Sequence, residues 1–329
     1  MDQYFRGIVI NELKENNFFE FLQESQEFLE IKQKFEASDE QYLRTILTAL
    51  LSDNTIQQVD SKYKLTSSNL NIRDTPPLIF DEPIQDLAIN MAKAVFDRIH
   101  GKYFQSTSGF NLFLFDDVLS QKAYEILRRA ALSFAPEPKH NPGKLLDLGC
   151  GNGTGTADIW VQIMEQHKYN PNKEFEIIGI DINEDLLSLA QEEFYRLVKK
   201  FSNIEKEDYL KLKYYYPKFQ KGTSTSIPFP DNYFDFVYIS QVMHWTDLKQ
   251  TLNEVFRVLK PNGIFFGTQV LIPRANSYLN LMLKTIDGAD GFFTKQDFIK
   301  YAKEAGFSIL KFCTPATIFK FLKKLDNTL

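Results

Sequence analysis

The stretch LLDLGCGNGTG, residues 145–155, decides the fold of this chain. Its first four residues are mainly apolar and predict a buried parallel strand. The glycines that follow are poor strand and helix residues, so they predict a turn. Residues 156–166 then carry apolar side chains at helical spacing. The predicted order is strand, glycine-rich turn and helix. In such a turn a ligand can approach the backbone closely, and the helix N-terminus offers free N–H groups.

The spacing of the glycines distinguishes between two kinds of cofactor. A dinucleotide site needs G-x-G-x-x-G, but Thr154 or Thr156 stands at the third glycine in either frame. The pattern present is D-x-G-x-G-x-G, from Asp147 to Gly153. On its own it is also compatible with a purely structural turn. It resembles the first motif of class I S-adenosylmethionine-dependent methyltransferases.

A second buried strand is predicted at residues 176–183, and it contains Asp181 near its end. A carboxylate at the end of such a strand can accept hydrogen bonds from both ribose hydroxyls. The alternative is that Asp181 caps the following helix, although Asn183 is better placed for that. The resemblance implies that Asp181 binds the ribose, and it makes the neighbouring Ile182 a further cofactor-binding candidate.

The third strand is predicted at residues 219–222 and is followed by Thr223 and Ser224. In the resembled family an acidic residue commonly follows this strand and meets the adenine amino group. Here a hydroxyl or backbone group of Thr223 or Ser224 would take its place.

Three further segments resemble the family in the expected order. They are IPFPDNYFDFV at 227–237, RVLKPNG at 257–263, and residues 293–307. The resemblance covers about residues 110–325 and implies an α/β fold with a doubly wound, mostly parallel seven-stranded sheet, the Rossmann-like methyltransferase fold. Its last two strands, expected at 308–313 and 317–323, would be antiparallel.

Residues 1–70 are predicted to form a mainly helical domain. A capping box at Ser38–Gln41 predicts a helix start, and residues 55–66 predict a hairpin. Helices followed by a hairpin resemble the winged-helix module that many small-molecule methyltransferases use to dimerise. DNA binding is the rival interpretation. The segment has seven basic and twelve acidic residues, a net charge of −5, which is the wrong sign for DNA.

The predicted domains are therefore 1–70, helical and winged-helix-like; 71–109, a linker that also covers the pocket; and 110–329, the S-adenosylmethionine-binding domain. Pocket walls are expected from residues 84–116 and 271–290. Neither stretch carries a motif that identifies the acceptor, so the methylated atom stays open between oxygen, nitrogen, carbon and sulfur.

The implied reaction is in-line displacement at the sulfonium methyl of S-adenosylmethionine, in which the protein mainly aligns the reactants. The resemblance places the backbone of Gly149, Gly151 and Gly153 against the methionine part and the ribose. It also implies that Asp147 supports the turn and reaches the amino group of the cofactor through water. Gln241, after the fourth strand, would lie near the methionine end.

His244 is the one histidine near a predicted ligand-facing strand end, and it is the candidate general base. The alternative is a half-buried imidazole that packs against Trp245. Four histidines and two cysteines show no metal-ligand spacing, so no metal is expected.

Composition sets the remaining expectations. The chain has 329 residues and a net charge of −5, which argues against a general nucleic-acid or anionic-membrane binder. A signal peptide and an apolar run of about 20 residues are not expected, so a cytoplasmic protein is predicted. The favoured function is methyl transfer to a small molecule, by a possible homodimer. The alternatives are a winged-helix regulator that senses S-adenosylmethionine without catalysis, and a nicotinamide oxidoreductase, which the missing dinucleotide motif disfavours.

Overall fold

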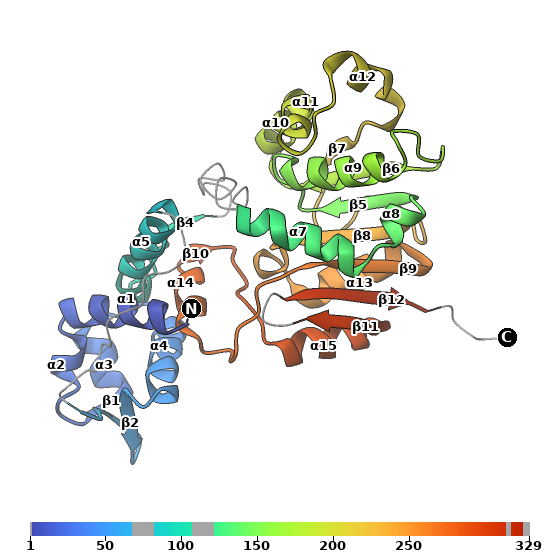
Figure 1. Cartoon of the computed structure of the whole chain (residues 1–329). Coiled ribbons are helices and arrows are strands. Elements are labelled where there is room, and N and C mark those ends of the chain that lie inside the picture. The colour runs from blue at the N-terminus through green and yellow to red at the C-terminus, as the bar shows by residue number, and fades with distance from the viewer. Residues whose placement is uncertain (1, 68–81, 107–121, 314–316, 325–329) are drawn as a thin grey trace. The chain divides into compact units, whose positions relative to one another are not determined.

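Figure 1 shows the computed structural model of the chain, which describes residues 2–67, 82–106, 122–313 and 317–324. These residues form two compact units. The first comprises 1–110 and 272–294, and the second 111–271 and 295–329. The segment 272–294 thus groups with the N-terminal residues, although it lies inside the predicted 110–329 domain. Residues 71–81 and 107–109 of the predicted linker lie outside the described residues. No described helix combines the length and apolar character needed to cross a bilayer.

The first unit is mainly helical, as predicted. Its described elements are α1 (Asp2–Glu15), α2 (Phe18–Phe21), β1 (Gln26–Glu27), α3 (Phe28–Lys34), α4 (Glu40–Ser52), β2 (Ile56–Val59), β3 (Lys62–Leu65), α5 (Glu82–Ile99), β4 (Gln105–Ser106), α14 (Tyr278–Leu283) and β10 (Ile286–Asp287). The predicted hairpin is confirmed, because β2 and β3 pair antiparallel. Its turn residues Asp60 and Ser61 both have positive φ, as a two-residue hairpin turn requires. β1 joins this hairpin in the order β1-β3-β2.

The predicted capping box at Ser38 is wrong by one residue. Asp39 is the N-cap of α4, and its side chain accepts a hydrogen bond from the backbone N–H of Tyr42 at 2.8 Å. An aspartate is as good a cap as a serine, and Asp39 lies three residues before the donor, as capping geometry requires.

The segment 272–294 is held to the N-terminal helices by buried hydrogen bonds. The hydroxyl of Tyr278 donates to Asp53 at 2.7 Å, and the hydroxyl of Tyr42 donates to the carbonyl of Leu281 at 2.7 Å. Asp53 also accepts a hydrogen bond from Arg6. Burial raises the pKa of Tyr278, which therefore stays protonated as a donor. This late segment is thus an integral part of the first unit.

The second unit contains the glycine-rich stretch. Its described elements are α7 (Lys122–Phe134), α8 (Glu137–His140), β5 (Lys144–Leu148), α9 (Thr154–Gln166), β6 (Glu176–Asp181), α10 (Glu184–Glu192), α11 (Phe194–Phe201), α12 (Lys206–Lys211), η1 (Lys213–Tyr215), β7 (Lys218–Lys221), β8 (Phe234–Ser240), η2 (Met243–Trp245), α13 (Leu248–Val258), β9 (Leu259–Thr268), α15 (Lys295–Glu304), β11 (Phe307–Cys313) and β12 (Ile318–Lys323).

The sheet of this unit has seven described strands in the order β11-β12-β9-β8-β5-β6-β7. The strands from β9 to β7 pair parallel, and β12 pairs antiparallel with both β9 and β11. The predicted doubly wound, mostly parallel sheet is therefore confirmed, as is its terminal antiparallel pair. The carboxyl ends of β5, β6 and β8 lie at one edge, where ligands bind in open α/β sheets.

Helices cover both faces of the sheet (Figure 1). On one face α7, α9 and α11 form a buried cluster with strand residues that include Leu145, Ile177 and Tyr238. On the other face α13 and α15 place Phe256 and Phe298 against phenylalanines of β11 and β12. Along β5 the side chains alternate between these faces, so Asp147 lies on the same face as Leu145. The acid is thus directed towards α7 and α9.

The tyrosine-rich segment 205–216 between β6 and β7, called the insertion below, is tied to the core by Trp160. The indole N–H of Trp160 donates to the carbonyl of Tyr215 at 2.7 Å, and its ring meets those of Phe194 and Tyr209 edge-on. Trp160 is completely buried, whereas the neighbouring Tyr214 is 70% exposed. The insertion therefore contributes to the core through a few inward-facing rings.

We expect Trp160→Phe to lower the free energy of unfolding by about 2–3 kcal/mol, because it removes a buried hydrogen bond and leaves a void. Tyr214→Phe is the matched control and should change it by less than about 0.5 kcal/mol. Urea unfolding followed by circular dichroism measures both. Equal losses in the two variants would show that Trp160 does not anchor the insertion.

Candidate functional site

The glycine-rich turn follows a backbone path that only glycine adopts at low cost. Gly149, Gly151 and Gly153 have φ angles of 74°, 53° and 80°. The carbonyl of Ile180 accepts hydrogen bonds from the amides of Gly149 and Cys150, at 2.8 and 3.1 Å. The turn is thereby fixed to the end of β6.

The three glycines differ in what a side chain would meet. A Cβ at Gly149 would lie 2.4 Å from a methyl group of Val242, and one at Gly153 would lie 2.9 Å from the Cβ of Ala190. A Cβ at Gly151 would meet no atom within 4 Å. Gly149 and Gly153 are thus needed for packing, whereas Gly151 borders open space that a ligand could occupy.

Asp181 joins the end of β6 to the glycine turn. One carboxylate oxygen accepts a hydrogen bond from the amide of Gly151 at 3.0 Å, and the other accepts from the amide of Asn183 at 3.0 Å. Burial raises the pKa of Asp181, and these backbone donors partly oppose the rise. The side chain of Asn183 caps α10 by accepting from the amide of Leu186, so Asp181 is not the helix cap.

The residues next to Asp181 differ in their exposure. Ile182 is 60% exposed, which is unusual for a large apolar side chain. The hydroxyl of Thr223 lies 3.0 Å from that of Thr225. The hydroxyl of Ser224 is buried and shares a 3.0 Å hydrogen bond with Thr251 of α13. Of the two predicted adenine-site residues, Ser224 thus directs its side chain into the protein.

Asp147 lies beneath the turn, and it is 3% exposed. Its carboxylate accepts a 2.6 Å hydrogen bond from the hydroxyl of Thr156 in the first turns of α9. In the sheet Asp147 is flanked by Gly179 of β6 and Tyr238 of β8. Burial raises the pKa of Asp147 to about 6, although Thr156 and Arg128 lower it.

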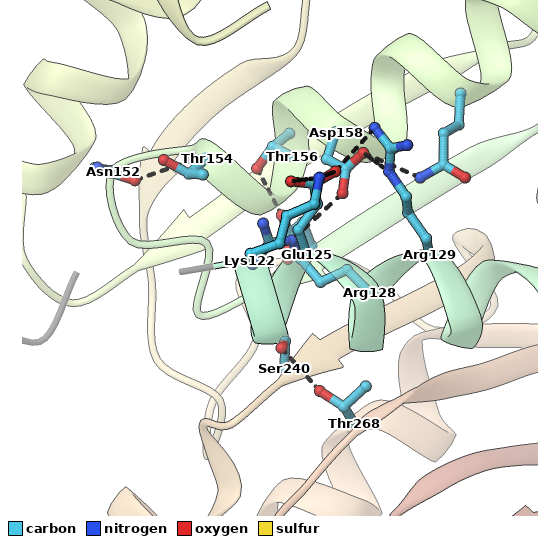
Figure 2. Close-up of polar contacts among 12 residues, drawn as sticks. Lys122, Glu125, Arg128, Arg129, Asn152, Thr154, Thr156, Asp158, Ser240 and Thr268 are labelled. Atoms are coloured by element: carbon cyan, nitrogen blue, oxygen red, sulfur yellow. Dashed lines mark hydrogen bonds and ion pairs between the residues drawn. The ribbon is translucent and has the colours of Figure 1, made fainter. Parts of the chain in front are cut away.

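Figure 2 shows a charge cluster between α7 and α9, around the buried Asp158, that was not predicted from the sequence. The Arg128 guanidinium lies 3.6 Å from Asp158, and the Arg129 guanidinium lies 3.3 Å from the other oxygen of the same carboxylate. Gln162 also donates to Asp158, at 3.1 Å. Burial raises the pKa of Asp158, and both arginines oppose that rise. The sequence did contain one indication of this cluster, because Asp158 is the charged residue in the otherwise apolar helical stretch 157–161.

Gln241 connects the ends of β8 and β9. It has a positive φ of 57° and is 4% exposed. Its side-chain carbonyl accepts a hydrogen bond from the backbone N–H of Val270 at 2.9 Å. The backbone N–H of Gln241 donates to the carbonyl of Thr268 at 3.0 Å. The side chain of Gln241 therefore supports the carboxyl edge of the sheet.

His244 lies in η2, and it is 2% exposed. Gln269 accepts a hydrogen bond from the amide of Met243, so its side-chain NH₂ faces His244 Nδ1 at 3.1 Å. Burial lowers the pKa of His244 to about 3, which makes the imidazole neutral near pH 7. Its ring lies 4.7 Å from that of Trp245, centroid to centroid. This arrangement favours a structural role over a general-base role. Gln269 carried no sequence signal.

The structure brings the predicted site residues together in two groups. Asp147, the turn glycines and Asp181 meet at the ends of β5 and β6, whereas Gln241 and His244 follow β8. Within the described part of the chain, no three His, Cys, Asp or Glu side chains are grouped so as to hold a metal ion. The first group can present backbone amides and a carboxylate to a nucleoside.

Comparisons with known proteins give a consistent result. A family model described as "Methyltransferase domain" matches residues 146–267. An uncharacterized methyltransferase of Schizosaccharomyces pombe is 36% identical over 121 residues, which are 36% of this chain and 37% of that protein. A demethylmenaquinone methyltransferase of Symbiobacterium thermophilum is 29% identical over 142 residues, which are 43% of this chain and 48% of that protein. The matches therefore span less than half the length of these relatives.

A solved structure with a similar fold is that of the CurJ carbon methyltransferase. It matches with a TM-score of 0.66 and 15% sequence identity, over 98% of this chain and 92% of that one. At this identity the match shows the fold alone.

The contrast between the turn glycines can be tested by alanine substitution. We expect Gly149→Ala to lower the free energy of unfolding by at least about 3 kcal/mol, since strain at positive φ adds to the clash with Val242. Gly151→Ala should cost only about 1–2 kcal/mol, because the strain acts alone there. Chemical denaturation of both variants measures the difference. A cost at Gly151 equal to that at Gly149 would contradict the open space assigned to it.

The buried charge of Asp147 should itself destabilise the fold. A carboxyl whose pKa rises from 3.8 to about 6 on folding favours the protonated form. The stability that the protonated carboxyl contributes is therefore fully present below about pH 4, and it is lost as the pH rises through 6 and the carboxyl ionises. We expect Asp147→Asn to raise the free energy of unfolding at pH 8 by about 2–3 kcal/mol, and this gain should shrink towards zero near pH 4. Chemical denaturation of both proteins across this pH range measures the gain. A gain in the free energy of unfolding that did not change with pH would show that the charge of Asp147 does not destabilise the fold.

Proposed function

The chain carries a class I S-adenosylmethionine-dependent methyltransferase domain, and we propose that it transfers the methyl group of S-adenosylmethionine to a small-molecule acceptor. The acceptor class is taken from the relatives, one of which is named as acting on demethylmenaquinone. Because the matched segments cover less than half of those relatives, the activity of the whole chain is part of the proposal.

The observation that carries the proposal is the link between Asp181 and the glycine turn. The carboxylate of Asp181 accepts the amide of Gly151, and the space beside Gly151 is open. A carboxylate held in this way would accept hydrogen bonds from the ribose hydroxyls. The exposed side chain of Ile182 would pack against the adenine ring. Thr223 would contribute a hydroxyl or backbone group nearby. Ser224 would contribute indirectly, through the hydrogen bond between its hydroxyl and that of Thr251.

The cofactor supplies the reactive methyl group on a positively charged sulfur. In the transfer, a lone pair of the acceptor forms the new bond to the methyl carbon, and the electrons of the carbon–sulfur bond remain on sulfur. The chain would hold the donor in line with the acceptor and exclude water. Asp147 and Gln241 would contribute by fixing the ends of β5 and β8 beneath the methionine part.

A general base is needed only if the acceptor must lose a proton before it reacts. Because the pKa of His244 is about 3 and Gln269 occupies Nδ1, His244 is poorly matched to that task near pH 7. The proposed mechanism therefore depends on positioning of the donor, and the base role of His244 stays a prediction.

Three finer features belong to the same proposal. Residues 1–70 would form a winged-helix-like module through which two copies associate, and the protein would act in the cytoplasm without binding nucleic acid. The order of helices and the three-stranded sheet in this segment supports the winged-helix-like module, and its net charge of −5 argues against nucleic-acid binding. No observation favours the regulator without catalysis.

Calorimetric titration tests the cofactor assignment. We expect S-adenosylhomocysteine to bind the wild-type protein, and NADH not to bind. Asp181→Ala should weaken binding at least about tenfold, because hydrogen bonds to a charged group contribute roughly 1.5–3 kcal/mol each. Glu184→Gln, an exposed charge three residues away, is the control and should stay within about twofold of wild type. Tight NADH binding, or unchanged affinity in Asp181→Ala, would overturn the assignment.

A further inference from the structure

The loop 222–226 follows β7, the outermost described strand on its side of the sheet. It begins at Asp181, whose backbone carbonyl accepts a hydrogen bond from the backbone N–H of Gly222 at 3.0 Å. It then lies against α13, where the side chain of Gln250 donates to the carbonyl of Thr225 at 2.9 Å. Because α13 directly follows η2, the loop runs from the Asp181 group of predicted site residues to the elements that carry the other group.

We propose that Thr251 of α13 is a positioning residue of the cofactor site: its buried hydroxyl couples the loop 222–226 to η2. The two parts of the carboxyl edge are then held at a fixed separation before the nucleoside binds. This inference rests on the proposed function, because it specifies what preforms the nucleoside end of that site.

Three hydroxyl groups form a continuous chain through Thr251. Its Oγ1 atom lies 3.0 Å from the hydroxyl of Ser224 and 2.9 Å from that of Thr246. The hydroxyl of Thr246 in turn donates to the carbonyl of Met243 in η2, at the longer distance of 3.5 Å. Because each hydroxyl has a single proton, this end sets the direction of donation, from Ser224 to Thr251 and from Thr251 to Thr246. Hydrogen bonds in such a chain polarise and strengthen one another.

The burial of the chain indicates what the hydroxyls contribute. Thr251 is 0% exposed and Ser224 is 6% exposed, so water competes little for their hydrogen bond. Replacing both partners of a buried hydrogen bond by apolar groups of the same shape is often close to neutral for stability. What the hydroxyl pair adds is therefore mainly geometry, because a hydrogen bond fixes a distance and a direction that an apolar contact leaves free.

Other side chains of α13 also hold this part of the chain, but they lie nearer the surface. Gln250, which binds the carbonyl of Thr225, is exposed. The half-buried Glu254 accepts a hydrogen bond from the backbone N–H of Ile227 at 2.8 Å, just beyond the loop 222–226. Of these α13 side chains Thr251 is the fully buried one, so its contact is the one least weakened by solvent.

Substitutions at Thr251 separate positioning from simple stabilisation. Thr251→Val keeps the shape but breaks the chain. We expect it to weaken S-adenosylhomocysteine and 5′-methylthioadenosine by the same factor, about fivefold to tenfold, because the two ligands share the nucleoside. Thr251→Ser keeps the hydroxyl, so both affinities should stay within about twofold of wild type, although the lost methyl group lowers stability. Calorimetric titration measures the affinities, and urea unfolding measures the stabilities.

Ser202→Ala is the matched control. It removes a buried hydroxyl that follows α11 and accepts a hydrogen bond from the backbone N–H of Ile204 at 3.2 Å. This variant should lose stability and keep the wild-type affinity for both ligands.

Hydrogen exchange tests the coupling itself. Thr246→Val cuts the chain at its far link and leaves the contact between Ser224 and Thr251 in place. We expect amide exchange to accelerate at residues 243–246 and also in the loop 222–226, because the chain transmits the loss. Acceleration at residues 243–246 alone would show that the two segments are independent and would overturn the inference. The same experiment decides the matter if Thr251→Val does not fold.

The binding experiments can also overturn the inference. Unchanged affinities in a folded Thr251→Val would remove Thr251 from the site, and equal losses in Thr251→Val and Thr251→Ser would assign it a merely structural role. A loss confined to S-adenosylhomocysteine would place the effect at the methionine part, contrary to the inference. If the wild type binds neither ligand, it is the proposed function that fails, and the exchange experiment still decides whether the loop 222–226 is coupled to η2.

Discussion

The withdrawal of two carboxylates from water, complete for Asp147 and partial for Asp181, is the constraint on which the second unit depends. Asp147 and Asp181 lie at the ends of adjacent strands, and burial raises the pKa of each. Each acid is compensated locally, Asp147 by the hydroxyl of Thr156 and Asp181 by two backbone amides. These hydrogen bonds join the ends of β5 and β6 to the turn and to the first turns of α9. The two carboxylates, whose burial destabilises the fold, thus also fix the shape of the carboxyl edge of the sheet.

The glycine turn illustrates how packing and ligand access are divided within one motif. Val242 and Ala190 fill the space beside Gly149 and Gly153, so these two glycines bring neighbouring elements into contact with the turn. Only Gly151 leaves room, and its amide is the one that Asp181 holds. A repeat of three apparently equivalent glycines therefore contains two positions that packing requires and one that borders open space. The same sheet edge continues at β8, where Gln241 and Gln269 satisfy buried backbone groups with side-chain amides.

Much of the second unit could be predicted from the sequence because its signals are local. Apolar runs that end in an acid or a glycine indicated β5 and β6, and Asn183 was identified as the better cap of α10. The buried pair of Arg128 and Asp158 was not predicted, since its residues are 30 positions apart and only the packing of α7 on α9 brings them together. The low pKa of His244 was missed for a similar reason: its proximity to a strand end was visible, whereas its burial and its contact with Gln269 depend on β9.

The path of the chain between β9 and α15 has a consequence for biosynthesis. After β9 the polypeptide leaves the second unit, contributes residues 272–294 to the first, and then returns to add α15, β11 and β12. A ribosome thus releases the first hundred residues long before Tyr278 and Leu281 exist to pair with Asp53 and Tyr42. The N-terminal helices must wait, with apolar surface uncovered, until most of the chain has emerged. Nascent chains arrested before residue 272 should accordingly depend on chaperones far more than those arrested beyond residue 294.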